Sequence, residues 1–196
     1  HLSIRRQRQM CIRDRELTRF TERYVPQAEQ VVYAGLSGDR RELVKPYDPD
    51  TLKTIERIQS ERFEIVPYSD GCRYETDKGE KVRSKSEVII ANLLNGYSDV
   101  LIYQYEKPLY LENDGTEVVV HPDFTVYNLI TGKIIYWEHA GMIDDTEYAS
   151  DFVRKYNLYL ANGFIPCDNL MITFECQEKP LDIGNVKRII NKIAEG

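Results

Sequence analysis

Two carboxylates, Asp123 and Glu138, occupy neighbouring segments that both have the composition of β-strands. Residues 121–127 and 133–139 are rich in β-branched and aromatic side chains, which strands favour. The intervening residues 129–132 end in glycine and suit a four-residue hairpin loop. The pattern therefore predicts an antiparallel hairpin that carries one carboxylate on each strand.

The register of this hairpin decides what the two carboxylates can do. If Asn128 pairs with Lys133, then Asp123 lies directly opposite Glu138 and shares its face of the sheet, with Cβ atoms about 4.5–5.5 Å apart. Two ionised carboxylates at that separation repel each other. A hairpin that keeps such a pair therefore needs a proton or a cation between them.

Short segments with polar or charged side chains occur before, within and after the hairpin. In chain order the segments are Val82 to Glu87 (VRSKSE), Tyr105 to Leu109 (YEKPL), Pro122 to Phe124 (PDF), Trp137 to Gly141 (WEHAG), and Lys155 with Tyr159. Together they resemble the PD-(D/E)XK nuclease superfamily, and in particular a group of mostly uncharacterised bacterial and phage proteins. The resemblance covers residues 79–175.

The resemblance implies a restriction-endonuclease-like αβββαβ core and a Mg²⁺-dependent, endonuclease-like enzyme that hydrolyses DNA phosphodiester bonds, with endo- and exonuclease action both left open. Asp123, Glu138 and Glu87 would be the metal ligands, and Mn²⁺ would substitute for Mg²⁺. Their chemistry fits this assignment, because Mg²⁺ prefers oxygen ligands and is typically held by one or two carboxylates. Glu87 would also orient the attacking water, so all three carboxylates are candidate catalytic residues.

The chain departs from the superfamily pattern at one position. The signature expects a lysine two residues after the glutamate, on the same strand face, and this position is Ala140. Lys155 is one candidate replacement, because it borders the apolar face of the next helix and can extend its ammonium while its stem stays buried. His139 is the second candidate. Strand alternation turns its ring toward the side of Phe124 and Trp137, where it would chiefly stabilise the fold.

Glu87 also has a purely structural interpretation. Ser84 and Glu87 have the spacing of a capping box, in which the glutamate reaches back to the helix N-terminus. However, Glu87 shares a helix face with Ile90, Ala91 and Leu94, the stripe that should face the core. A carboxylate in line with a buried stripe needs a partner, which favours a role at the site over capping alone.

Two other polar residues have open roles. Glu106, in the first strand of the meander, is either an outer carboxylate of the site or a charge at a strand edge. His121 shares the Asp123 face and is a candidate proton-transfer group. A zinc site built from His121 and His139 is disfavoured, because the two rings should point to opposite faces of the sheet.

The order of elements predicts an α/β fold with a mixed sheet. A helix that starts after Ser84 precedes a three-strand meander, which is followed by a second helix, a fourth strand and a last helix capped by Asp182. The strands are expected at 100–111, 117–127, 133–139 and 169–175, with a turn at Asn113-Asp114-Gly115 between the first two. The second helix should turn Ala149, Phe152, Val153, Tyr156, Tyr159 and Leu160 inward.

Residues 1–78 are predicted to form an N-terminal appendage to a nuclease-like domain at 79–196. The chain begins with His rather than Met, so we expect a fragment or a processed product. Residues 2–15 hold five arginines and one aspartate and resemble translated sequencing-adapter sequence, so residues 1–15 are interpreted as foreign to the gene. Short helices are expected at 16–30 and 50–58, and a strand at 63–68.

Composition is compatible with one sizeable core. The chain has 196 residues, 42% of them hydrophobic, and a formal net charge of −6. This charge argues against a general nucleic-acid coat protein, whereas a nuclease needs only a local basic patch. The basic residues before and inside the first core helix are either such a patch or a solvated loop: Arg73, Lys78, Lys81, Arg83 and Lys85. No apolar run is long enough to span a bilayer and no signal peptide is visible, which predicts a cytoplasmic protein without membrane contact.

Two classes of function therefore remain. The leading hypothesis is a metal-dependent nuclease that acts on DNA, with RNA as the alternative substrate, and a homodimer is compatible with the sequence. The second is a catalytically silent nucleic-acid-binding or accessory module on the same fold, which Ala140 favours. The retained Asp123, Glu138 and Glu87 argue against it, because a silent module has no reason to keep mutually repelling carboxylates.

Overall fold

A computed structural model describes residues 35, 37, 49–63 and 73–196. The chain divides into His1–Asp48 and Pro49–Gly196, and every element discussed below belongs to the second unit. Residues 1–15, the helix predicted at 16–30 and nearly all of the strand predicted at 63–68 lie outside the described residues. The predicted domain boundary between residues 78 and 79 stays a prediction.

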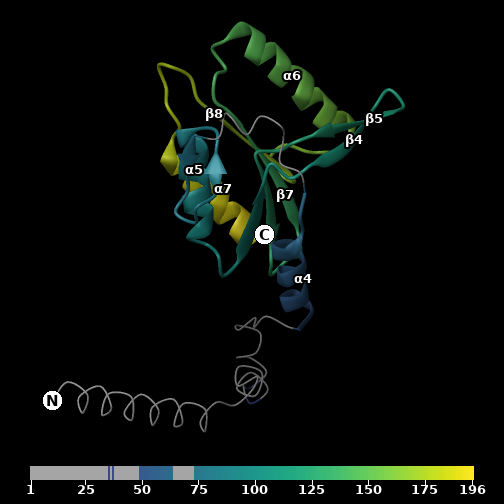
Figure 1. Ribbon diagram of the computed structural model, residues 1–196, viewed down its shortest axis with the longest axis vertical. Helices are drawn as coiled ribbons and strands as arrows, with labels where there is room; N and C mark the ends of the chain where they lie inside the picture. The colour runs from purple at the N-terminus through teal and green to yellow at the C-terminus, as the bar shows by residue number, and fades with distance from the viewer. Residues whose placement is uncertain (1–34, 36, 38–48, 64–72) are drawn as a thin grey trace, which may run out of the picture. The chain divides into compact units, whose positions relative to one another are not determined.

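A four-stranded mixed sheet in the order β3-β6-β7-β8 forms the centre of this unit (Figure 1). Its strands are β3 (Leu101–Tyr105), β6 (Phe124–Asn128), β7 (Ile134–Ala140) and β8 (Leu170–Phe174). β6 runs antiparallel to both β3 and β7, whereas β8 runs parallel to β7. The α/β class and the mixed sheet are therefore confirmed.

Helices cover both faces of the sheet. α5 (Lys85–Asn95) and α7 (Ile183–Glu195) bury their apolar stripes against one face, and α6 (Thr146–Ala161) packs over the other (Figure 1). α4 (Pro49–Ser60) approaches β3, where the Gln104 side chain donates a hydrogen bond to the Ile58 carbonyl at 2.9 Å. The main elements thus follow the predicted order α5-β3-β6-β7-α6-β8. None of the helices in the described ranges is long and apolar enough to cross a membrane.

Side chains placed at the helix starts define where these helices begin. Ser84, Asp145 and Asp182 precede α5, α6 and α7, and each accepts a hydrogen bond from the backbone N–H three residues later. Such caps satisfy amide groups that have no partner within the helix. The predicted caps at Ser84 and Asp182 are confirmed.

The first two strands of the predicted meander are interrupted. The strand expected at 100–111 breaks after β3 and resumes as β4 (Leu109–Asn113), and the strand expected at 117–127 splits into β5 (Thr116–Val120) and β6. The two continuous strands are therefore wrong as predictions. Proline explains both breaks, because Pro108 and Pro122 have no N–H to donate to a ladder.

β4 and β5 pair with each other as a separate two-stranded hairpin that projects from the sheet (Figure 1). Its turn is at Asp114 and Gly115, which have φ values of 49° and 79°. Two successive left-handed residues match the twist of the strands that they join. The predicted turn is therefore confirmed, although the strands on either side leave the main sheet.

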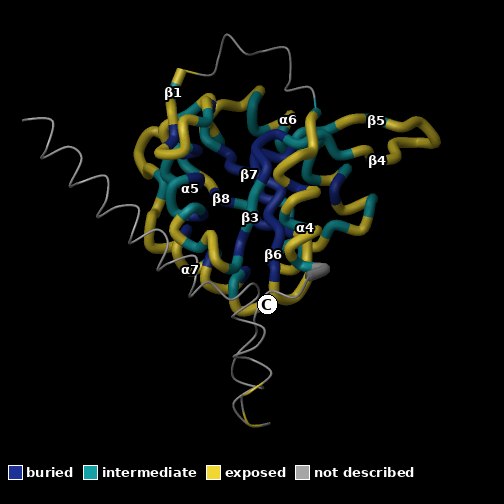
Figure 2. Tube along the Cα trace, turned by 60° about the horizontal axis from the view of Figure 1, so that its bottom comes forward, coloured by how far each residue is buried: buried dark blue, intermediate teal, exposed yellow. Residues whose placement is uncertain are grey.

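The core lies mainly between the sheet and the α5/α7 layer. Phe124 and Trp137 face each other across β6 and β7, and both are fully buried in it. Figure 2 shows the central strands as the buried centre of the unit. The α6 layer is thinner, since Tyr159 is buried but Val153 and Leu160 are exposed. The prediction that Val153 and Leu160 turn inward is wrong. The face of α6 that packs on the sheet is narrower than the distribution of apolar residues along this helix suggests.

Candidate active site

Asp123 and Glu138 lie opposite each other at one end of the antiparallel pair β6–β7. The ladder pairs Phe124 with Trp137, so the next pair along it is Asp123 with Glu138. Both carboxylates are buried, with 6% and 4% of their surface exposed. The register predicted from the loop length is thus confirmed.

Asp123 is held by groups from two other segments. Its Oδ2 accepts a hydrogen bond from the backbone N–H of His139 at 2.6 Å. Its Oδ1 lies 3.6 Å from the guanidinium of Arg83, the residue just before the cap of α5. These contacts fix the carboxylate at the point where β7 and the start of α5 converge.

The charge of Asp123 is unfavourable in this setting. Burial raises the pKa of Asp123 well above its usual range, and the negative charges of Glu138 and Glu87 raise it further, while Lys155 opposes them. Desolvation and like charges both favour the protonated acid. An additional cation at this position would therefore reduce the repulsion between the carboxylates and favour the ionised form of Asp123.

Glu138 is held by two side chains of α6. The Lys155 ammonium lies 2.6 Å from its Oε1, and the Tyr159 hydroxyl donates to the same oxygen at 2.6 Å. Lys155 and Tyr159 are one helical turn apart and so present their polar ends to one point. Lys155 also donates to the His121 carbonyl at 3.0 Å. An ammonium thus reaches Glu138 from the helix, while Ala140 on the strand has no charge to offer.

Glu87 combines a capping position with contacts directed toward the site. The Ser84 hydroxyl oxygen accepts a hydrogen bond from the Glu87 N–H at 3.1 Å, as an N-cap should. The Glu87 carboxylate accepts hydrogen bonds from the Arg83 N–H at 2.9 Å and from the Tyr105 hydroxyl at 2.6 Å. It is buried, and its charge acts on Asp123. The two interpretations of Glu87 are therefore not exclusive.

Arg83 and Glu106 form an ion pair at the edge of the cluster. Burial raises the pKa of the Glu106 carboxyl, although the Arg83 charge acts against this rise. Glu106 has a φ of 48°, in the left-handed region that non-glycine residues rarely adopt. This backbone strain occurs where β3 ends, and the Glu106 side chain is almost fully buried. Strained residues of this kind are concentrated at functional sites.

The sequence did not single out Arg83 as a site residue and left Glu106 undecided. The one available signal is Pro108, which ends the strand two residues after Glu106. The conformation that turns Glu106 toward Arg83 follows from that break and not from strand periodicity. Arg83 is a member of the predicted basic patch and pairs with Glu106 and Asp123, although it is exposed, as are Lys81 and Lys85.

The His139 ring lies on the sheet face opposite to Glu138. Its Nδ1 is 3.0 Å from the Thr173 hydroxyl, which also accepts a hydrogen bond from Trp137 Nε1 at 3.1 Å. Its Nε2 is 3.3 Å from Glu175 Oε1. His139 therefore touches Asp123 only through its backbone N–H, as strand alternation predicts.

Glu175 joins this second face to the start of α5. Its Oε2 accepts hydrogen bonds from the Ser86 hydroxyl at 2.7 Å and from the Leu181 N–H at 3.0 Å. Burial acts to raise the pKa of Glu175, but the hydrogen bonds from Ser86 and His139 lower it overall. Glu175 thus connects β7 to α5 on the sheet face opposite to the carboxylate cluster.

The cluster meets one requirement of a Mg²⁺ site, because it offers carboxylate oxygens as possible ligands. Asp123 and Glu138 are opposed oxygen donors on one sheet face, and burial together with the charges of Glu138 and Glu87 acts against the ionised form of Asp123, which added positive charge would favour. Within the described part of the chain, no group of three or more His, Cys, Asp or Glu side chains is arranged to hold a metal ion. Glu87 is instead held by Arg83 and Tyr105, so the three-carboxylate ligand set stays a prediction.

Comparison with known proteins adds a distant relative and no family. No known protein-family profile matches the chain. The chain is similar to the uncharacterized protein MJ1519 of Methanocaldococcus jannaschii, with 34% identity over 101 residues. The matched segment is 51% of this chain but only 8% of that protein, so the chain spans a small part of its relative's length. Membership of the PD-(D/E)XK superfamily stays a prediction.

Proposed function

We propose that the protein is a metal-dependent nuclease that hydrolyses DNA phosphodiester bonds, with Mg²⁺ or Mn²⁺ held by Asp123 and Glu138. The observation that carries this proposal is the buried, opposed pair itself. Asp123 has a raised pKa because of burial and the nearby carboxylates. Two carboxylates this close share a proton or need a cation in addition to Lys155. A divalent ion is the cation that would also serve phosphodiester hydrolysis.

Each residue of the cluster then has a role that its contacts support. The metal ion, when bound, would polarise a phosphoryl oxygen and favour ionisation of water. Lys155, beside Glu138, would stabilise negative charge that develops on the phosphate. Glu87, fixed by Tyr105, would orient the attacking water. His139 would position Asp123 through its backbone N–H.

DNA is the proposed substrate because exposed basic residues lie close to Glu87 along the chain. Lys78, Lys81 and Lys85 are exposed just before and at the start of α5, the helix that carries Glu87. Phosphate contacts by such residues supply most of the affinity for nucleic acid. A nuclease that acts on intracellular DNA would work in the cytoplasm, which is the location that we propose.

A second candidate function is a silent nucleic-acid-binding module on the same fold. Ala140 favours it, because this fully buried residue stands on the Glu138 face where the superfamily pattern expects a lysine. The proximity of Lys155 to Glu138 favours the nuclease, because an ammonium is present at the carboxylate pair from another element. Catalysis separates the two candidates.

The experiment is a plasmid-cleavage assay with Mg²⁺, Mn²⁺ or a chelator. The wild-type protein should cleave with either metal and be inactive with the chelator. Asp123→Ala and Glu138→Ala should abolish cleavage while the circular dichroism spectrum stays that of a folded protein. Glu117→Ala, which removes an exposed carboxylate on the projecting hairpin, is the matched control and should cleave normally. Cleavage that persists in either site variant would refute the assigned metal site, and DNA binding without any cleavage would select the silent module.

A further inference from the structure

One stripe of α6 connects the carboxylate cluster to an aromatic pair. Phe152, Lys155 and Tyr159 succeed one another at spacings of three and four residues and so share a helix face. Lys155 and Tyr159 contact Glu138, as described above. Phe152 contacts Phe174 of β8, with ring centroids 5.8 Å apart and ring planes at 73°. The aromatic pair is therefore adjacent to the site along the helix.

Phe174 is also adjacent to the site along the sheet. It pairs with Ala140 across β7 and β8, and Ala140 shares a strand face with Glu138 two residues earlier. Although its ring contacts Phe152, Phe174 is 54% exposed. This aromatic ring next to the carboxylate cluster thus leaves much of its surface uncovered by the residues that the structure describes.

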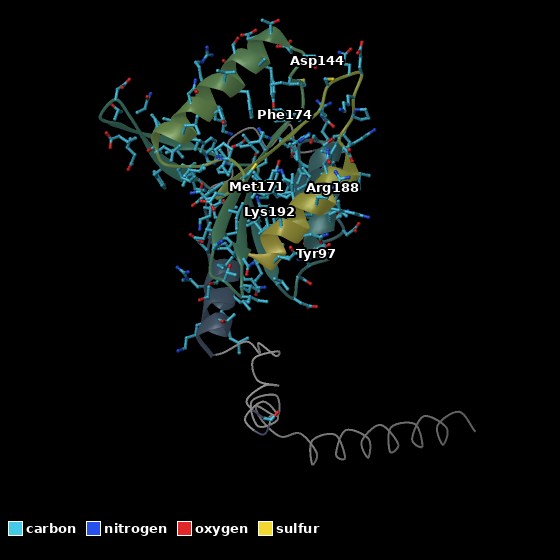
Figure 3. The ribbon with its side chains drawn as sticks, turned by 180° about the vertical axis from the view of Figure 1, so that it is seen from behind. Tyr97, Asp144, Met171, Phe174, Arg188 and Lys192 are labelled. Atoms are coloured by element: carbon cyan, nitrogen blue, oxygen red, sulfur yellow. The ribbon has the colours of Figure 1, made fainter. Side chains whose placement is uncertain are left out.

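Basic side chains lie beyond this ring. β8 is an edge strand, and a groove of about 420 Å³ runs between it and the start of α7, lined by Phe174, Lys179 and Arg188 among others. Figure 3 shows Phe174 between α6 and α7, with Arg188 on the α7 side. Asp182 also lines the groove, but its carboxylate is engaged as the cap of α7 by the Asn185 N–H. The groove thus combines one aromatic ring with two basic residues.

We propose that Phe174 stacks against a base of single-stranded DNA whose phosphates lie along Lys179 and Arg188, an inference that rests on the proposed function. Proteins bind single strands in this way, with aromatic rings under the bases and a basic groove along the backbone. The bases of a duplex are stacked on one another, so an internal base pair has no free face for Phe174. The substrate at this site is therefore an unpaired strand or a frayed end that passes from the groove to the carboxylates.

Binding of a short single-stranded oligonucleotide that carries 2-aminopurine tests this subsite without requiring cleavage. The wild-type chain, in chelator and at low salt, should quench the 2-aminopurine fluorescence and bind the single strand more tightly than the matching duplex. Phe174→Leu keeps an apolar side chain but removes the stacking surface. It should weaken single-strand binding roughly 5- to 150-fold, which corresponds to the usual contribution of one stacked base. Phe174→Trp should restore both affinity and quenching.

Matched controls separate stacking from general effects. Tyr110→Ala removes another exposed aromatic side chain, on the projecting hairpin, and should leave binding unchanged. Lys179→Ala and Arg188→Ala should each reduce the slope of log affinity against log salt concentration by about 0.7, the value for one phosphate contact on a single strand. The melting temperature of every variant confirms that it is folded.

The possible results distinguish this inference from the proposed function. Equal binding by Phe174→Leu and Phe174→Trp, or equal affinity of the wild type for duplex and single strand, would overturn the subsite even if the protein cleaves DNA. Single-strand binding that depends on Phe174, in a protein that cleaves nothing with Mn²⁺, would support the subsite and refute the nuclease.

Discussion

Asp123 is a buried carboxyl group with two further carboxylates in range, and its ionised form needs positive charge nearby. The Lys155 ammonium contacts the Glu138 carboxylate, and the Arg83 guanidinium lies near the carboxylates of both Glu106 and Asp123. Lys155 opposes the rise in the pKa of Asp123 but does not cancel it, because burial and the charges of Glu138 and Glu87 raise this pKa well above its usual range. At the scale of the residue, the site is therefore expected to be strained without metal and relaxed with it.

Asp123→Asn should raise the melting temperature of the metal-free protein at pH 7. The pKa of Asp123 is raised in the folded state, so the unfolded chain releases this proton at a lower pH, about 3.9, than the folded protein does. The stability of the folded protein therefore decreases as the pH rises above that value. The gain should therefore be present at neutral pH and vanish toward pH 4, at about 2–4 °C for each kcal/mol relieved. Thermal melts in chelator across this pH range give the answer. A variant that melts below wild type at pH 7 would show that the carboxylates do not repel.

Lys155→Ala should reduce the single-turnover cleavage rate at saturating Mn²⁺ by about two orders of magnitude or more, as loss of other charge-stabilising donors does. His139→Ala is the informative contrast, because the His139 ring faces Thr173 and Glu175 and not Glu138. It should chiefly lower the free energy of unfolding, by about 1–3 kcal/mol for the buried partners left unsatisfied. Near-normal rates for Lys155→Ala, with an inactive but folded His139→Ala, would reverse the two roles.

Much of the site at the residue scale follows from the sequence, and the reason is periodicity. Strand alternation and a four-residue loop place Asp123 opposite Glu138, and one helical turn brings Lys155 and Tyr159 together. The ion pair of Arg83 with Glu106 obeys no such period. It depends on a left-handed residue and on where a strand stops, which are tertiary outcomes.

Among the elements, the strands show how proline limits what hydrophobic pattern can predict. The residues on either side of Pro108 and Pro122 have strand composition, so the pattern alone predicts two long strands. The structure keeps β3 and β6 in the sheet and releases β4 and β5 as a hairpin. Where β3 ends, the Glu106 N–H donates to the Asp123 carbonyl at 3.1 Å, and His121 Nδ1 lies 3.1 Å from the Glu106 carbonyl.

The junction of β6 with α7 depends on Asn128, a fully buried residue with four polar contacts. Its Nδ2 donates to the Ile193 carbonyl at 2.7 Å and lies 3.3 Å from that of Ala194, and its Oδ1 accepts from the N–H groups of Ile130 and Thr131 at 2.8 and 2.9 Å. One side chain thus fixes both the hairpin loop and the end of the last helix.

Asn128→Ala should therefore lower the free energy of unfolding by about 2–3 kcal/mol, because buried donors and acceptors lose their partners. Urea denaturation measures the loss. Asn157→Ala, on the exposed face of α6, is the control and should change stability little. A loss below about 0.5 kcal/mol for Asn128→Ala, within the range of ordinary surface substitutions, would mean that the β6–α7 junction is not stabilised by this side chain.

At the scale of the whole molecule, the unit Pro49–Gly196 contains a four-stranded sheet with helices on both faces. The order of its main elements could be predicted because helices and strands differ in their hydrophobic period and because side-chain caps mark where the helices begin. The mixed sheet follows from that order. The helix α6 connects β7 to β8, and a strand reached through such a helical crossover runs parallel to the strand before it. Contacts between residues that are far apart in the sequence, such as the hydrogen bond of Ser86 to Glu175, could not be predicted.

Deletion of residues 1–15 should leave the melting temperature and DNA affinity nearly unchanged, because their composition resembles adapter-derived sequence. These residues lie outside the described part of the chain, so the prediction rests on the sequence alone. Anisotropy titration of a labelled oligonucleotide compares the two chains. A large loss of affinity would instead identify the five arginines of this stretch as a binding arm.

The claim that Asp123 and Glu138 form one metal site is tested most directly by Mn²⁺ binding, which requires no knowledge of the substrate. Electron paramagnetic resonance titrations should compare wild type with Asp123→Asn, Glu138→Gln and the double variant. Because both side chains would hold one ion, each single substitution should remove most of the binding and the second should add little. Mn²⁺ affinity that is unchanged in both single variants would contradict the account.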